Sequence, residues 1–216
     1  MSQVPTTKSA DSQTPIVTTC DASDVSAYTN IPSVVSARTP KEINQLALLY
    51  DTDTTLPNKS NHAPFLLEAH PDFGAHMKAF MYNAWENLGA TIKINSVYRT
   101  PAHQARLLRE YNANPAGKAK PGTTSYHLYG MAMDFNPTLK DGKQLGKSFN
   151  SSVDEWVKSG IVAAGERVNL YWGGRFSRNY DPIHFDFRNV AVSTTAVASL
   201  VREQEMTAAP NRVALA

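Results

Sequence analysis

The stretch Gly130–Phe135, with the sequence GMAMDF, alternates bulky apolar residues with small or charged ones. Successive side chains of a β-strand point to opposite faces, so this alternation predicts a strand whose two methionines and phenylalanine face the core. Gly130, Ala132 and Asp134 then line the other face, where the small size of the first two leaves room beside the carboxylate for a hydrated ion and a substrate. His127 comes just before the strand, close enough for its imidazole to share a metal ion with Asp134.

A second strand of the same kind is predicted at Ile183–Phe187, with the sequence IHFDF. Its apolar residues alternate with His184 and Asp186, which therefore point away from the core. Asp181 comes just before this strand. The two strands together place histidine and carboxylate side chains on polar faces whose reverse sides are apolar.

His127, Asp134 and His184 form a candidate zinc site. Two histidines and one aspartate supply three protein ligands and leave the fourth tetrahedral position of Zn²⁺ open for water, which is typical of a catalytic site. Zinc lowers the pKa of bound water to roughly 7, and a nearby carboxylate that is not a ligand can accept its proton. Asp181 is the candidate for this base.

Each of these candidate ligands also has a simpler, purely structural interpretation. A single histidine in an aromatic-rich domain is more often a hydrogen-bonded structural residue than a ligand, and Asp134 alone would suit a turn or a helix cap. We expect the structural role for the four remaining histidines, which are His62, His70, His76 and His103. The combination of two histidines and an aspartate on polar strand faces favours the metal.

Further elements are predicted outward from these strands. Ile92 and Ile94 alternate with polar residues and predict a strand, and Val168–Trp172 predicts another. Helices are predicted from capping signals and three-to-four spacing. They begin at Pro40, at about Asp72, at Pro101, after Ser152 and near Thr195. With no βαβ rhythm, the order favours an α+β fold with a small, mostly antiparallel sheet and flanking helices.

Two of these helices are predicted in detail. In the helix from Pro40, capped by Thr39 with Glu42 at the third position, the buried face is expected to hold Ile43, Leu46, Leu49 and Tyr50. A polar loop is expected over 51–61. In the helix from about Asp72, the apolar stripe comprises Phe73, Met77, Phe80, Met81, Ala84, Trp85 and Leu88.

Four parts of the chain are distinguished. Residues 1–38 are rich in Ser, Thr, Ala and Asp and are expected to form a flexible N-terminal arm. Residues 39–61 hold a helix and linker, 62–206 the domain with the candidate zinc site and 207–216 a C-terminal tail. The arm could equally order against a partner.

Composition excludes several classes of protein. The net charge is +2 with dispersed lysines and arginines, which argues against nucleic-acid binding. The single cysteine, Cys20, cannot form an internal disulfide, so any metal must use histidine and carboxylate. We expect no secretion signal and no membrane span. The protein is therefore expected to start in the cytoplasm, so that a target outside the cytoplasm would require another means of delivery.

The motifs together resemble those of the LAS-type metallopeptidases of family M15. The matching residues are Ser96–Thr100, the pattern Ser125-x-His127-x-x-Gly130-x-Ala132-x-Asp134, the run Trp172-Gly173-Gly174, and Asp181-x-x-His184-Phe185. Within the family they are most similar to the L-alanyl-D-glutamate endopeptidases of phage endolysins and bacterial wall hydrolases. The resemblance implies a LAS/hedgehog-like peptidase fold over residues 62–190.

The resemblance also implies roles for individual residues. His127, Asp134 and His184 would bind Zn²⁺, and Asp181 would be the catalytic base. Arg99 would polarise the scissile carbonyl and stabilise the oxyanion, a role that suits a permanently charged guanidinium. Otherwise Arg99 would form a surface or helix-start salt bridge. Substrate-binding roles are assigned to Ser125, Tyr126, Trp172 and Arg175.

The leading functional hypothesis is hydrolysis of the peptidoglycan stem peptide between L-alanine and D-glutamate, by a phage lysin or an enzyme carried in a virion. Two alternatives remain open. One is a D-alanyl-D-alanine carboxypeptidase or dipeptidase on the same scaffold. The other is a zinc-bearing, non-catalytic structural or binding module of a phage particle, with the arm docked on a virion or tail partner.

Overall fold

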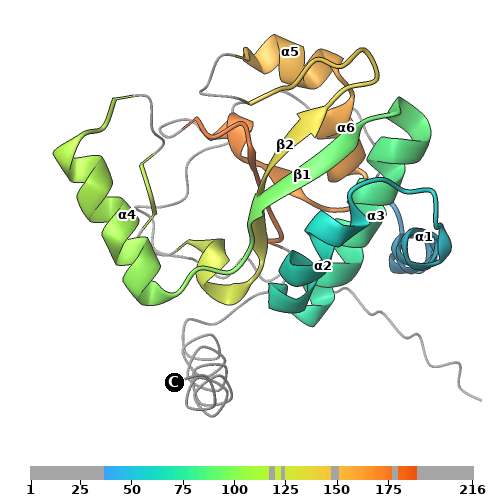
Figure 1. The fold of residues 1–216 in the computed structure, drawn as a ribbon, viewed down its shortest axis with the longest axis horizontal. Helices are drawn as coiled ribbons and strands as arrows, with labels where there is room; N and C mark the ends of the chain where they lie inside the picture. Colours follow the sequence, from blue (N-terminus) through green and yellow to red (C-terminus); the bar gives the residue numbers. More distant parts are fainter. Residues whose placement is uncertain (1–36, 117–119, 123–124, 147–150, 177–179, 189–216) are drawn as a thin grey trace, which may run out of the picture.

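A small antiparallel sheet lies at the centre of the computed structural model, which describes residues 37–116, 120–122, 125–146, 151–176 and 180–188 (Figure 1). Its strands, in the spatial order β1-β2-β4-β3, are all antiparallel to their neighbours. They are β1 (Thr91–Ser96), β2 (Ala132–Thr138), β3 (Tyr171–Trp172) and β4 (His184–Asp186). The helices around them are α1 (Pro40–Thr52), α2 (Lys59–Glu68), α3 (Pro71–Leu88), α4 (Pro101–Ala113), α5 (Val153–Lys158) and α6 (Ile161–Glu166), with short 3₁₀ turns η1 (Tyr126–Tyr129) and η3 (Gly173–Arg175). The predicted α+β class is confirmed.

The two central strands present aromatic rings to the core. Phe135 of β2 and Phe185 of β4 are fully buried, and each ring centroid lies 5.2 Å from that of Phe80 in α3. Since side chains alternate along a strand, the neighbouring residues Asp134 and His184 face the other way, and they are direct cross-strand partners. The predicted strand faces are confirmed.

Strand β1 has a register shift near its end, beside Asp134. Ile92 and Ile94 are buried and the intervening Lys93 is exposed, as predicted. Between Ile94 and Ser96 the pairing with β2 slips, so that Ser96 lies opposite Asp134. Such a bulge re-aims the end of a strand, and here it delivers the chain after Ser96 to the edge where Asp134 lies.

Helix α1 begins where its capping residues predict. The Glu42 carboxylate accepts a 2.7 Å hydrogen bond from the Thr39 backbone N–H, while Thr39 caps the helix in return. Its buried face differs from the prediction: Leu49 is 39% exposed, Leu46 is only partly buried, and Ala47 is buried between Ile43 and Tyr50.

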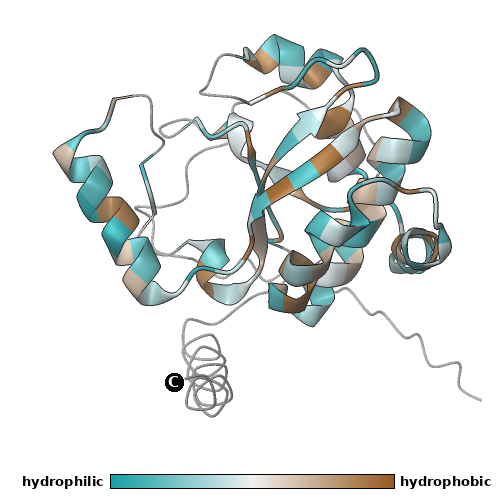
Figure 2. Cartoon of the chain, viewed as in Figure 1, coloured by the Kyte–Doolittle hydropathy of each residue, from teal (hydrophilic) through white to brown (hydrophobic). Residues whose placement is uncertain are grey.

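Helix α3 buries most of its predicted apolar stripe, although Trp85 and Leu88 are only partly buried. It packs against α1 and β1, which places the helical layer of α1 to α3 on one side of the strands. Helix α4 lies across the strands from these helices and is largely hydrophilic (Figure 2). It begins at the predicted Thr100 cap, whose hydroxyl accepts from the His103 N–H.

Several predicted boundaries are wrong. The strand predicted over Gly130–Phe135 is β2, which begins at Ala132 because Gly130 ends the preceding 3₁₀ turn, and which continues to Thr138. The expected polar loop over 51–61 ends in α2, which the sequence analysis missed altogether. The single helix predicted after Ser152 is divided into α5 and α6 at Gly160, whose φ of 80° is disfavoured for residues with a side chain. The strand predicted over Val168–Trp172 is reduced to β3, because Asn169 adopts a left-handed conformation with φ of 59°.

Several predictions fall outside the described residues. These are nearly all of the arm 1–38, the helix expected near Thr195 and the tail 207–216. A partner for the arm and a phage origin therefore stay predictions. Within the described residues, none of the helices combines the length and apolar character that spanning a bilayer requires.

His62 in α2 joins the helical layer to the sheet. It is 1% exposed, accepts from the Tyr50 hydroxyl at 3.0 Å and donates to the Ile92 carbonyl at 2.8 Å. Burial lowers its pKa, outweighing the bond to Ile92, because a charged imidazole is poorly solvated there. The predicted structural role of this histidine is confirmed.

This placement predicts a pH dependence of stability. Unfolded His62 binds a proton below its ordinary pKa of 6.5, whereas the folded chain resists it. Its contribution is therefore present above pH 6.5 and is lost as the pH falls toward the lower folded pKa, by at most about 1.4 kcal/mol per pH unit. Urea unfolding at pH 7.5, 6.5 and 5.5 should give a steeper loss of stability for the native chain than for His62→Gln. Parallel losses in the two proteins would contradict this assignment.

Candidate metal centre

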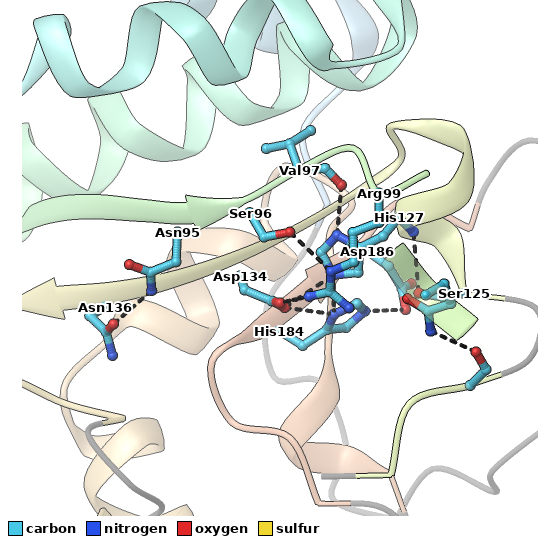
Figure 3. A network of polar contacts seen from close by, with 12 residues as sticks. Asn95, Ser96, Val97, Arg99, Ser125, His127, Asp134, Asn136, His184 and Asp186 are labelled. Atoms are coloured by element: carbon cyan, nitrogen blue, oxygen red, sulfur yellow. Dashed lines mark hydrogen bonds and ion pairs between the residues drawn. The ribbon is translucent and has the colours of Figure 1, made fainter. Parts of the chain in front are cut away.

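Three buried side chains from three different elements converge on one point (Figure 3). His127 belongs to η1, Asp134 to β2 and His184 to β4. The Asp134 Oδ1 atom lies 3.1 Å from both His127 Nε2 and His184 Nδ1, and the two nitrogens are 3.2 Å apart. Ligand atoms 2.0–2.2 Å from a tetrahedral ion stand roughly 3.3–3.6 Å from one another, so the spacing suits a small divalent cation.

A tight turn presents His127 to the strands. Ser125 caps η1 by accepting from the His127 N–H, and Gly130 ends the turn with φ of 64°. A Cβ atom on Gly130 would lie 2.6 Å from the Glu68 carbonyl oxygen, so the close approach of α2 as well as the backbone angle requires glycine. Ser125 therefore helps to orient this loop, and substrate binding by Ser125 stays a prediction.

Each histidine is anchored through the nitrogen that faces away from the cluster. His127 Nδ1–H donates to the Val97 carbonyl at 2.6 Å, and His184 Nε2–H donates to Asp186 at 3.2 Å. These bonds select the tautomers that point His127 Nε2 and His184 Nδ1, with their lone pairs, at the shared point. Metal-ligating histidines almost always have such a partner.

Asp186 is itself held in place. Its carboxylate is 1% exposed and accepts from Arg188 Nε at 2.7 Å and from Arg188 Nη2 at 2.9 Å. The ion pair with Arg188 and the bond from His184 keep the pKa of Asp186 below its usual value despite burial. The Asp186 side chain is therefore an anion at neutral pH.

Electrostatics favour a cation at the centre. Burial opposes charge on His184, yet hydrogen bonds and charge from Asp134 and Asp186 raise its pKa to about 10. The pKa of Asp134, although burial raises it, is held well below its usual range by His127, His184 and Arg99. Burial lowers the pKa of His127, so it stays neutral and keeps a free lone pair. A divalent cation would take the place of the proton on His184, so binding depends on pH.

Arg99 follows β1 and reaches the same cluster. Its Nε donates to the Ser96 hydroxyl at 3.0 Å, and its Nη2 forms an ion pair with Asp134 Oδ2. The guanidinium therefore reaches the predicted site and pairs with Asp134, one of the three candidate metal ligands. The surface salt bridge considered as an alternative is wrong, because the side chain is only 14% exposed and its partner is the buried Asp134.

Asp181 lies at the entrance to β4 and is half-buried. Burial and the negative charge of Asp134 raise its pKa to about 6, against the opposing charges of His184 and Arg99. Carboxylates tuned toward neutrality are suited to accept and return protons. The structure thus brings Asp181, Arg99 and the three candidate ligands into one electrostatic unit.

The predicted substrate residues lie in different environments. Tyr126 is partly exposed in η1. Trp172 is fully buried and donates from Nε1 to the Pro182 carbonyl at 2.7 Å. Arg175 is 6% exposed and its Nε meets Glu166 at 2.6 Å. Structural contacts account for Trp172 and Arg175, and substrate binding by any of these residues stays a prediction.

Two residues that anchor this cluster were not predicted from the sequence. Arg188 lies two positions after Asp186 and continues the polar alternation of His184 and Asp186, a signal that could have found it. The Val97 carbonyl could not have been found, because a backbone acceptor has no residue-type signature.

The segment that holds all three candidate ligands is similar to a known protein family. Residues 118–187 match the model of an M15 peptidase family described as D-alanyl-D-alanine carboxypeptidase. This part of the chain is similar to known peptidases. A similar solved structure is the L-Ala D-Glu endopeptidase ChiX of Serratia marcescens, at 19% identity and a TM-score of 0.43, over 60% of this chain and 87% of that one. No curated protein matches this chain.

Proposed function

We propose that this protein is a zinc-dependent peptidase that hydrolyses the stem peptide of bacterial peptidoglycan between L-alanine and D-glutamate. The observation that carries the proposal is the convergence of His127, Asp134 and His184 with both histidines anchored for metal binding. The match of this segment to an M15 peptidase family supports the peptidase activity. Zinc bound there would act as a Lewis acid and lower the pKa of a bound water to roughly 7.

The chain's own residues divide the remaining work. The Asp181 carboxylate accepts the proton of the attacking water and returns it to the leaving amine. Arg99 keeps Asp134 oriented through Nη2, and its permanent positive charge stabilises the negative charge that develops on the carbonyl oxygen of the substrate. The anchors Val97 and Asp186 hold the two histidines in place throughout.

The choice of bond rests on motifs in the sequence. Aspartate at position 181 and the Trp172-Gly173-Gly174 run resemble the endopeptidase branch of the family. A second candidate, removal of terminal D-alanine, is favoured by the match of residues 118–187 to a family described as D-alanyl-D-alanine carboxypeptidase.

Mass spectrometry of digested wall separates the two activities. Purified peptidoglycan treated with the protein should yield glycan strands that still carry L-alanine with a free carboxyl group at each cleaved stem, together with peptides that begin with D-glutamate. Release of D-alanine alone would identify the second candidate instead. A zinc chelator should stop the reaction and added zinc should restore it, and digestion that persists in the chelator would exclude the zinc mechanism.

A further inference from the structure

Arg188 occupies a cage of aromatic rings beside the metal centre. Its guanidinium carbon lies 5.5 Å from the ring centroid of Tyr126, 5.8 Å from that of Tyr171 and 5.1 Å from that of Phe176. These rings come from η1, β3 and the end of η3. Aromatic faces attract a guanidinium and restrict its motion, so the cage fixes where the positive charge of Arg188 is held.

The caged guanidinium faces a carboxylate that solvent cannot reach. Both Asp186 oxygens accept from Arg188, and Oδ2 also accepts from His184 Nε2. Because a buried carboxylate is stable only when it is paired, the charge and orientation of Asp186 depend on Arg188. The orientation of His184 depends in turn on Asp186.

We propose that Arg188 is a positioning residue that sets the metal affinity of the centre by acting through Asp186 on His184. This inference rests on the proposed zinc site. Arg188 keeps the Asp186 carboxylate aligned through two hydrogen bonds, and Asp186 holds the His184 ring in one orientation through His184 Nε2. The cage adds a second link, since Tyr126 is adjacent to the ligand His127 and the Phe176 ring centroid lies 5.8 Å from that of His184.

Zinc affinity is the direct test. Competition of the full chain with a fluorescent zinc chelator should show one tight zinc per chain, and Arg188→Met should weaken zinc binding about 10- to 100-fold. Arg188→Lys retains a charge in the cage but lacks the planar fork that gives each Asp186 oxygen its own nitrogen. Its zinc affinity should therefore fall between those of the native chain and Arg188→Met. Asp186→Asn should resemble Arg188→Met, and the double variant should lose little more, because both changes break one chain of contacts.

Controls separate positioning from folding. Lys143→Met removes an ion pair with Glu155 between exposed groups and should leave zinc affinity within about 2-fold. The visible spectrum of the Co²⁺-substituted protein reports ligand geometry, and it should change in Arg188→Met but not in Lys143→Met. If Arg188→Met does not fold, Arg188→Lys and Asp186→Asn carry the comparison.

The outcomes distinguish this inference from the function on which it rests. Tight zinc binding by the native chain, with unchanged affinity and unchanged Co²⁺ spectrum in the Arg188 and Asp186 variants, would overturn the role of Arg188 and leave the zinc site intact. Failure of the native chain to bind one zinc would overturn both.

Discussion

Replacing His184 with alanine is expected to remove zinc from the purified protein and to abolish hydrolysis of the wall. His184 supplies one of three converging ligand atoms and is anchored by Asp186, so its loss leaves His127 and Asp134 as the remaining ligands. The fall in metal affinity should exceed the roughly 100-fold that loss of an outer partner costs, because a direct bond to the metal is lost. Zinc per folded chain and release of stem peptides measure the two effects.

His70→Ala is the matched control. His70 caps α3 by accepting from the Asp72 N–H at 3.3 Å and has no place in the ligand cluster. Its loss should lower stability by about 1 kcal/mol while zinc content and activity persist. If His184→Ala kept one zinc per chain and full activity, the metal centre assigned here would be wrong.

The site was predictable from sequence because strand alternation is a local property. In both central strands large apolar residues alternate with small or polar ones, so Asp134 and His184 could be assigned to the face opposite the core without knowing the fold. Their pairing across β2 and β4 was not predictable, since it depends on register between segments 50 residues apart. Arg99 was assigned to the site only through the family resemblance. In the structure, the bulge in β1 is the physical reason that Arg99 lies there.

Other features depend on contacts that leave little trace in the sequence. Helix α2 has Pro64 in its interior, and the side chain of Asn58 at its start makes no capping hydrogen bond, so the usual signals of a helix are missing. The helix is held by contacts such as the hydrogen bond of His62 to the Ile92 carbonyl. Arg175 follows a motif that suggested substrate binding, yet it pairs with Glu166. In both cases the deciding partner is a tertiary contact.

Replacing Asp181 with asparagine is expected to lower the turnover rate about 10²- to 10⁴-fold while zinc stays bound. Asparagine has nearly the same shape but cannot accept a proton from water, and positioned bases contribute rate factors of this size. Asp181 is not among the three ligand residues, so zinc content should match that of the native chain. Comparison of turnover at saturating substrate with zinc per chain distinguishes a base from a ligand, and loss of zinc in Asp181→Asn would contradict the assignment.

The pH dependence of activity and of stability, compared between the native chain and Asp181→Asn, gives a second test of Asp181 as the base. A base must be deprotonated, so native activity should fall as the pH drops through the pKa of Asp181, which is about 6 without metal and lower beside a bound cation. That acid limb should be absent from the residual activity of Asp181→Asn. Stability should move the other way: a folded pKa above the unfolded value of 3.8 gives a contribution that is complete below pH 3.8 and lost as pH rises through 6. At pH 7 the metal-free variant should therefore be more stable than the native chain, and a less stable variant would mean that Asp181 has a structural role.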